Sequence, residues 1–195
     1  ILYLATGAPD LSAPLADQEH AFAAQLALAA ALDLPVVVHV RDAGDDVRRI
    51  IDDVNERLTR GITERLAPDV RAAGRGATAA RAAPRVRGQL HCYSEGPDEV
   101  AGWLARGFHL SFSGTVTYPG SDALRAAVRL VPADRLLAET DAPYLTPQAA
   151  RGKRNEPAFV AHTVAVLAAV RGVEGDALAA QLAANAASLF GHRWG

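Results

Sequence analysis

Strand-like and helix-like segments alternate along this chain, and this order constrains the fold more than any other feature. The strand-like runs are "VVVHV" at 36–40, "RVRGQLHCYS" at 85–94, "FHLSFSG" at 108–114 and "RLLAETD" at 135–141. The segments with helical spacing of apolar residues are 17–32, 42–58, 97–107, 122–131, 156–172 and 174–191. Strands that alternate with helices pair in parallel through right-handed crossovers, so this order predicts an α/β fold. The β-branched run at 36–40 is typical of a strand buried on both faces.

The composition indicates one globular domain that spans residues 1–195. Half of the residues are hydrophobic (50%), 22% are charged and the formal net charge is -2, which does not suggest a dedicated polyanion binder. Cys92 is the only cysteine, which excludes an internal disulfide and fits a reducing cytoplasm. No apolar stretch reads as a membrane span. The chain contains no Met and begins at Ile1, so we expect a further segment upstream.

A segment rich in Arg and Ala, at about 59–85, interrupts the alternation. Between Arg57 and Arg87 the chain carries eight arginines and two acidic residues. We interpret this segment as an insertion in the domain that forms a solvated low-complexity loop. The alternative is a basic arm that contacts phosphates through its arginines.

Polar side chains stand where the predicted strands end. His39 follows "PVVV", His91 follows "GQL", and Glu139 and Asp141 follow "RLLA". Because side chains alternate along a strand, Glu139 and Asp141 are expected to point to the same side. The carboxyl ends of parallel barrel strands gather at one mouth, where imidazoles and a carboxylate make a plausible set of divalent-metal ligands.

Each of these residues also has a structural interpretation. A lone histidine at a strand end is more often a packing residue than a ligand. Asp141 could be a cap or turn residue before Pro143, and Glu139 could form an ion pair with an arginine. These alternatives explain single residues but not their shared position. We interpret the other histidines, which lie inside a strand or in helical and terminal segments, as structural: His20, His109, His162 and His192.

The strand-end motifs, in this order, resemble the TatD family of metal-dependent deoxyribonucleases, which are barrel members of the amidohydrolase group. The matching text covers nearly the whole chain apart from the insertion and the first dozen residues. It comprises "LPVVVHVRDA" (34–43), "LHCYS" (90–94), "GFHLSFSGTV" (107–116), "LLAETDAPYLTP" (136–147) and "RGKRNEP" (151–157).

The resemblance implies a TIM-barrel-type (β/α)8 hydrolase that cleaves DNA or another phosphodiester. It implies that His39, His91 and Asp141 bind metal, and that Asp141 also helps to activate water. It places Arg41 and Asn155 along the substrate cleft. The family holds two divalent cations (Mg²⁺, Mn²⁺ or Zn²⁺), which lower the pKa of water and neutralise charge on a phosphoryl group. Glu139 is expected next to the ligands rather than among them.

The chain also departs from the family pattern. No His-x-His pair is present, Thr6 aligns with a glutamate that bridges the metals, and Glu95 replaces a glycine near the expected phosphate. We count about five of the eight strands of a barrel, so we expect an incomplete barrel that holds at most one metal and has impaired activity. Its exposed sheet edges favour self-association.

Two other functions stay open at this stage. The chain could be a catalytically inactive, degenerate relative that acts as a binding protein or a decayed fragment. It could also hydrolyse an amide or ester instead of a phosphodiester, because the same fold hosts several chemistries.

Overall fold

The computed structural model describes residues 13–61 and 85–191. It divides the chain into two compact units, Ile1–Gly88 and Gln89–Gly195. Three sequence predictions fall outside the described residues: the alignment of Thr6 with a family glutamate, most of the insertion at 59–85, and the structural role of His192. The two units are described separately below.

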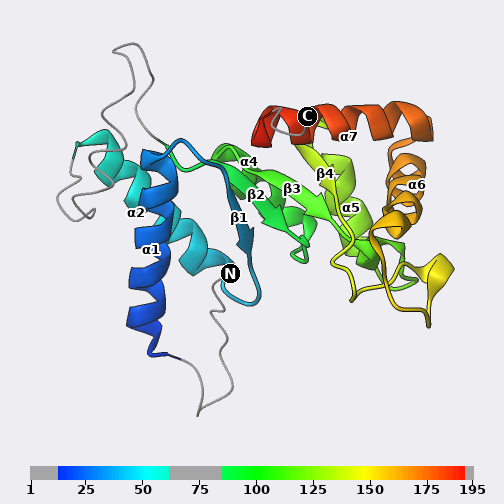
Figure 1. The fold of residues 1–195 in the computed structure, drawn as a ribbon, viewed down its shortest axis with the longest axis horizontal. Helices are drawn as coiled ribbons and strands as arrows, with labels where there is room; N and C mark the ends of the chain where they lie inside the picture. Colours follow the sequence, from blue (N-terminus) through cyan, green and yellow to red (C-terminus); the bar gives the residue numbers. More distant parts are fainter. Residues whose placement is uncertain (1–12, 62–84, 192–195) are drawn as a thin grey trace. The chain divides into compact units, whose positions relative to one another are not determined.

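The first unit contains two helices and a strand, drawn blue to cyan in Figure 1. They are α1 (Leu15–Ala31), β1 (Val36–His39) and α2 (Gly44–Thr59), which confirms the elements expected at 17–32, 36–40 and 42–58. Helix α2 buries one stripe of apolar side chains at steps of three and four, and α1 packs against it. The buried side chains of these two helices include Phe22, Leu26, Val47, Ile50, Ile51 and Val54.

Strand β1 is buried on one face rather than on both, which corrects the sequence prediction. Val38 is 5% exposed, whereas Val37 is 51% exposed. The N–H of Val36 donates to the carbonyl of Arg87 at 2.9 Å. A β-branched run therefore identified the strand but not the exposure of its second face.

The second unit is built on three parallel strands with helices between and after them (Figure 1). The strands are β2 (Gly88–His91), β3 (His109–Phe112) and β4 (Leu136–Ala138). Their register pairs Leu90 with Leu110 and Leu110 with Leu136. The helices are α4 (Val100–Ala105), α5 (Asp122–Leu130), α6 (Val160–Arg171) and α7 (Gly175–Phe190). The parallel α/β order predicted from the sequence is thus confirmed.

The helix starts differ in detail from the prediction. The segments expected to begin helices at 97 and 156 start as short 3-10 turns, η2 (Pro97–Glu99) and η6 (Pro157–Phe159), each with proline at its first position. Three further 3-10 turns flank the strands. Turn η3 (Gly114–Thr117) follows β3, η4 (Ala133–Arg135) precedes β4, and η5 (Gln148–Ala150) follows β4.

The core of the second unit is aromatic and aliphatic. Trp103, Phe108 and Phe112 are fully buried, and the Trp103 and Phe108 rings meet edge to face at 6.0 Å. The amide of Asn185, from α7, donates to the carbonyls of Ala133 and Leu136 at 2.7 and 2.8 Å. This buried side chain therefore fixes α7 against the start of β4.

Helices α6 and α7 contact β4 and each other. Leu167, Leu178, Leu182 and Leu189 are buried in this packing. Within the described ranges, no single helix is long and apolar enough to cross a membrane. The segments Pro157–Arg171 and Gly175–Phe190, bent by 108°, meet the criteria of length and composition only as a pair.

The loops after β3 and β4 touch at a glycine. A Cβ atom at Gly114 would lie 2.2 Å from the carbonyl oxygen of Leu145 and 2.9 Å from the nitrogen of Pro147. Both neighbours are backbone atoms, so no side-chain rotation can relieve the clash. Gly114 thus permits the close approach that fixes the loop after β4.

We expect Gly114→Ala to lower the free energy of unfolding by about 1–3 kcal/mol, the usual cost of overpacking a filled site. Gly120→Ala is the matched control, because a Cβ there meets nothing within 4 Å. Chemical denaturation of both variants measures the difference. Equal stability of the two variants would contradict the packing described here.

Candidate metal centre

The strand register brings the ends of β2, β3 and β4 to one place. Beyond the paired residues, the N–H of Tyr93 donates to the backbone carbonyl of Ser111 at 2.8 Å. The N–H of Glu139 donates to the backbone carbonyl of Phe112 at 3.0 Å. These two hydrogen bonds continue the ladders past the last strand residues. Side chains that directly follow the three strands therefore meet at one edge of the sheet.

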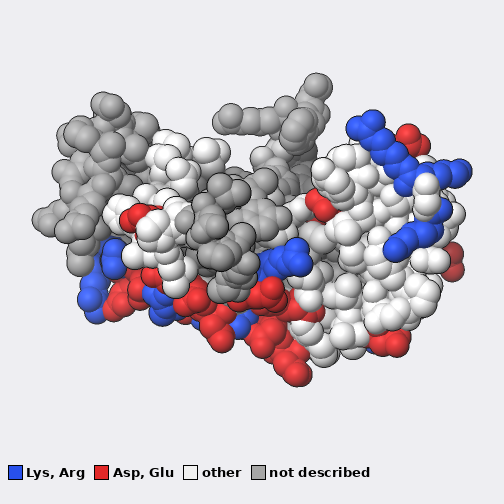
Figure 2. All heavy atoms as spheres, turned by 90° about the horizontal axis from the view of Figure 1, so that it is seen from below, with Lys and Arg blue, Asp and Glu red and all other residues white. Residues whose placement is uncertain are grey.

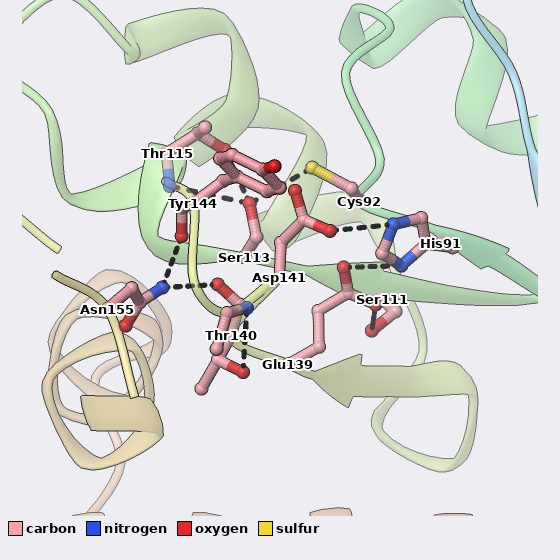
Figure 3. Close-up of polar contacts among 11 residues, drawn as sticks. His91, Cys92, Ser111, Ser113, Thr115, Glu139, Thr140, Asp141, Tyr144 and Asn155 are labelled. Atoms are coloured by element: carbon pink, nitrogen blue, oxygen red, sulfur yellow. Dashed lines mark hydrogen bonds and ion pairs between the residues drawn. The ribbon is translucent and has the colours of Figure 1, made fainter. Parts of the chain in front are cut away.

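The imidazole of His91 lies between two carboxylates at this edge (Figure 3). Its Nδ1 is 2.7 Å from Glu139 Oε1, and its Nε2 is 3.1 Å from Asp141 Oδ1. The hydrogen bond with Glu139 is the main cause that raises the pKa of His91. Partial burial opposes this rise, and the negative charge of Asp141 adds to it.

Glu139 is fixed from a second side by strand β3. Its Oε2 accepts a hydrogen bond from the Ser111 hydroxyl at 2.8 Å, and Ser111 is 1% exposed. In the described part of the chain, the ion pair of Glu139 is with His91 and not with an arginine. The alternative of a Glu–Arg pair is therefore wrong for this residue.

Asp141 reaches the same imidazole for a different reason than the sequence suggested. Strand β4 ends at Ala138, and Asp141 has φ 56°, so strand alternation does not direct its side chain. Its carbonyl accepts a hydrogen bond from the N–H of Tyr144 at 2.9 Å. Asp141 is thus also a turn residue before Pro143, and the turn directs its carboxylate to His91.

Asn155 holds this turn through its side-chain amide. It is 3% exposed, and its side-chain amide donates to the carbonyls of Thr140 and Tyr144 at 2.6 and 2.5 Å. Its Oδ1 accepts from the N–H of Glu156 at 2.9 Å. The amide is engaged with backbone on both sides of Asp141, whereas contact of Asn155 with substrate stays a prediction.

A row of small polar groups lies beside the carboxylates and was missed by the sequence reasoning. Cys92 Sγ lies 3.1 Å from Ser113 Oγ, which is 3.0 Å from Thr115 Oγ1. The signal that could have found Ser111 and Ser113 is their alternation within "HLSFSG", which directs both side chains to one face.

Burial raises the pKa of the Cys92 thiol to about 11. The negative charges of Glu139 and Asp141 add to this rise, and the Ser113 hydrogen bond opposes it. The thiol is thus neutral at physiological pH.

Glu95 is held on the side of α4. Its carboxylate accepts a hydrogen bond from the indole Nε1 of Trp103, which is fully buried. The hydroxyl of Tyr93 donates to the carbonyl of Gly96 at 2.7 Å and so fixes the same turn. The charge that replaces the family's glycine is therefore tied to a core residue.

The other predicted site residues belong to the first unit. His39 is the half-buried last residue of β1, and the Arg41 side chain is 73% exposed. Their roles as metal ligand and substrate contact stay predictions. Among the histidines interpreted as structural, His109 is the buried first residue of β3, and His20 and His162 are exposed on helices.

The donor atoms at the sheet edge fit a divalent cation. One nitrogen of His91 and one oxygen each of Glu139 and Asp141 all lie within 4.8 Å of one another. Ring nitrogen with carboxylate oxygen is a donor set that Zn²⁺ and Mn²⁺ accept. The short contact at Nδ1 suits Glu139 to orient the ring, which leaves Nε2 and Asp141 facing each other as candidate ligands.

The chain is similar in sequence to a known family and to several of its members. The sequence model of the family described as "TatD related DNase" matches residues 7–191. The chain is 35% identical over 173 residues to the uncharacterized metal-dependent hydrolase YcfH of Escherichia coli K12, covering 89% of this chain and 55% of YcfH. It is 39% identical over 179 residues to the 3'-5' ssDNA/RNA exonuclease TatD of Erwinia amylovora. This match covers 89% of this chain and 59% of that relative.

A solved structure is similar in fold. The crystal structure of YJJV, a TatD homolog from Escherichia coli K12, superposes with a TM-score of 0.71 at 26% identity. The match covers 93% of this chain and 60% of that one. The chain thus spans somewhat more than half the length of the relatives that it matches.

We expect Asn155→Asp to destabilise the protein more than Asn155→Ala. Alanine leaves two buried carbonyls without a donor, at a cost of about 1–3 kcal/mol for each. Aspartate also brings its own oxygen against those carbonyls and adds repulsion. Thermal unfolding at neutral pH compares the two variants. An Asn155→Asp variant as stable as the native chain would contradict the assigned amide orientation.

We expect iodoacetamide to alkylate Cys92 about 100-fold more slowly at pH 8 in the folded protein than in urea, because a pKa of about 11 instead of 9.0 leaves that much less thiolate. Mass spectrometry over time measures the rate, and Cys92 is the only thiol. Similar rates in both states would show that the thiol is not buried.

Proposed function

We propose, because the chain belongs to the TatD-related DNase family, that it forms a metal-dependent hydrolase that cleaves phosphodiester bonds of DNA. The observation that carries this proposal is the His91 imidazole held at 2.7 Å by Glu139 and at 3.1 Å by Asp141. Two carboxylates around one imidazole create a local excess of negative charge that a divalent cation neutralises.

The proposal assigns a task to each residue of the site. His91 and Asp141 bind the cation, together with His39 from β1, and Glu139 orients the His91 ring. Arg41 and Asn155 line the substrate cleft. When bound, a divalent cation stabilises negative charge on a phosphoryl group and makes nearby water more acidic. The metal is Mg²⁺, Mn²⁺ or Zn²⁺, with one ion per chain.

Asp141 is the proposed catalytic residue. Its side chain is 30% exposed, compared with 15% for Glu139. Its carboxylate therefore reaches solvent and can accept a proton from an attacking water. Glu139, engaged by Ser111 and His91, is less free to do so.

We expect Mn²⁺ at about 100 times its Kd to stabilise the protein by about 2.7 kcal/mol, which raises the Tm by about 5–10 °C in a chain of this size. His91→Ala should abolish this rise, because it removes the residue that both carboxylates face. His162→Ala, on an exposed face of α6, is the matched control and should keep it. A rise that survives in His91→Ala would place the cation elsewhere.

We expect hydrolysis of a single-stranded oligonucleotide in Mn²⁺, none in EDTA, and a loss of at least about 100-fold in kcat with Asp141→Asn. Gel analysis of the products measures the rate of oligonucleotide hydrolysis. Hydrolysis of bis-(p-nitrophenyl) phosphate and of a panel of esters is measured under the same conditions. A Tm rise without any hydrolysis would favour the inactive binding protein. Turnover of esters alone would replace the nuclease function.

A further inference from the structure

A serine interrupts the apolar run of strand β3. Ser111 stands between Leu110 and Phe112, which are fully buried, and it is itself only 1% exposed. Because side chains alternate along a strand, the two apolar neighbours point to the face opposite Ser111. A buried hydroxyl needs a hydrogen-bond acceptor, and here the acceptor is the carboxylate of Glu139 at 2.8 Å.

The backbone of Ser111 is joined to both flanking strands, because β3 lies between β2 and β4. Its carbonyl accepts from the N–H of Tyr93, two residues after His91, at 2.8 Å. Its register partner in β4 is Leu137, two residues before Glu139. The hydroxyl therefore has a fixed position relative to the strand of His91 and to the strand of Glu139.

Glu139 needs such an anchor to stay against the His91 ring. A glutamate side chain has several rotatable bonds and loses conformational freedom when it is held in one rotamer. In the described part of the chain, its Oε2 contacts the hydroxyl of Ser111 and its Oε1 contacts the ring of His91. One carboxylate thus joins a donor on β3 to a ring on β2.

Basic side chains do not hold this carboxylate. Figure 2 shows lysine and arginine side chains on the outside of the molecule, gathered at the right of that view. The three cations of the segment "RGKR" at 151–154 are exposed. Among the described residues, the ion pair of Glu139 is with His91. The neutral hydroxyl of Ser111 is therefore the group that fixes the second oxygen of Glu139.

A neutral His91 ring has one proton for two carboxylates. Its Nδ1 faces Glu139 at 2.7 Å and its Nε2 faces Asp141 at 3.1 Å. A proton on Nε2 would block the nitrogen beside Asp141, whereas a proton on Nδ1 leaves the lone pair of Nε2 open. The shorter contact and the anchored acceptor both favour the proton on Nδ1. The choice between the two nitrogens thus depends on Glu139 staying in place.

We propose that Ser111 is a positioning residue: through Glu139 it keeps the proton of the neutral His91 ring on Nδ1 and so leaves Nε2 open for a cation. This inference rests on the proposed function, since it states how the same site is prepared for its metal. The alternative is a hydroxyl that only stabilises the packing of β3 against β4. That alternative predicts a loss of stability and no change at His91.

The first measurement is the position of the His91 proton in the metal-free protein. Long-range proton–nitrogen correlation spectra distinguish the two ring nitrogens in the full 195-residue chain with isotope-labelled histidine. They are recorded in EDTA at alkaline pH, where the ring is neutral, and His91→Gln assigns the signal. We expect the native chain to carry the proton on Nδ1, and Ser111→Ala to shift it toward Nε2. Should Ser111→Ala fail to fold, Ser111→Cys, a weaker donor of similar size, takes its place.

The second measurement is the Kd of Mn²⁺, followed by the electron paramagnetic resonance of the free ion. Ser111→Ala should weaken binding by about 10- to 100-fold, the usual effect of removing a group that orients a metal ligand. Ser111→Thr keeps the hydroxyl and should recover most of the affinity. Ser113→Ala is the matched control, because that buried hydroxyl contacts Cys92 and Thr115 instead of a carboxylate. It should bind Mn²⁺ as the native chain does.

A double variant tests whether Ser111 acts through Glu139. Residues that act as one unit give non-additive effects. Glu139→Ala and Ser111→Ala/Glu139→Ala should therefore bind Mn²⁺ with the same affinity. A serine that acted independently of Glu139 would weaken binding further in the double variant, and this result would contradict the inference.

Two other results would overturn the inference: a proton that stays on Nδ1 in Ser111→Ala, or an equal loss of Mn²⁺ affinity in Ser111→Ala and Ser113→Ala. Its failure differs from failure of the proposed function. If the native chain hydrolyses bis-(p-nitrophenyl) phosphate in Mn²⁺ and Ser111→Ala behaves like it, the hydrolase stands and the positioning role is wrong. If the native chain binds no Mn²⁺, the proposed function is wrong, and the metal-free spectra still decide whether Ser111 acts on His91.

Discussion

The parallel register of β2, β3 and β4 is the constraint on which the site depends. It sets Leu90, Leu110 and Leu136 side by side, so the residues that follow each strand emerge at one edge. His91 then faces Glu139 without any long-range adjustment of the backbone. A shift of β2 by one residue would turn His91 to the other face of the sheet and Leu90 toward the carboxylates.

Register alone does not position Asp141, which also requires contacts with the neighbouring loops. The Asp141 turn is held on one side by the buried amide of Asn155 and on the other by the close approach of its loop to Gly114. The first contact joins residues 15 and 11 positions apart in sequence, and the second joins the loop after β3 to the loop after β4. The backbone at Asp141 is left-handed, which is unfavourable for a residue with a side chain unless its surroundings enforce it. The fold therefore stabilises a conformation that the turn would not keep alone.

The sequence predicted the elements well, because apolar spacing reports burial directly. The spacing of apolar residues predicted the buried stripe of helix α2 and the strand β3. The structure has both elements where they were expected. The exposed face of β1 could not be predicted in this way, because Val37 and Val38 are equally apolar and only the packing distinguishes them.

The site was less predictable from the sequence than the strands. Strand alternation suggested that Glu139 and Asp141 lie on one side, but the backbone of Asp141 is outside the strand and obeys the turn instead. A motif such as "RNEP" also cannot tell whether Asn155 faces substrate or backbone. That distinction depends on burial of the amide, which is a property of the packed loops.

The charges around the site act in opposite senses on a phosphate. Glu139 and Asp141 repel it, whereas Arg151, Lys153 and Arg154 in the adjoining loop attract it. The cations are exposed and so act through solvent, where their attraction is weakened by salt. The two carboxylates are partly buried, with side chains 15% and 30% exposed, so their repulsion is screened less. Attraction by the loop would therefore draw a phosphate toward the site but would not hold it against bare carboxylates. In the proposed function, a cation between His91 and Asp141 would remove that repulsion, so binding of metal and binding of a phosphodiester at this edge would support each other.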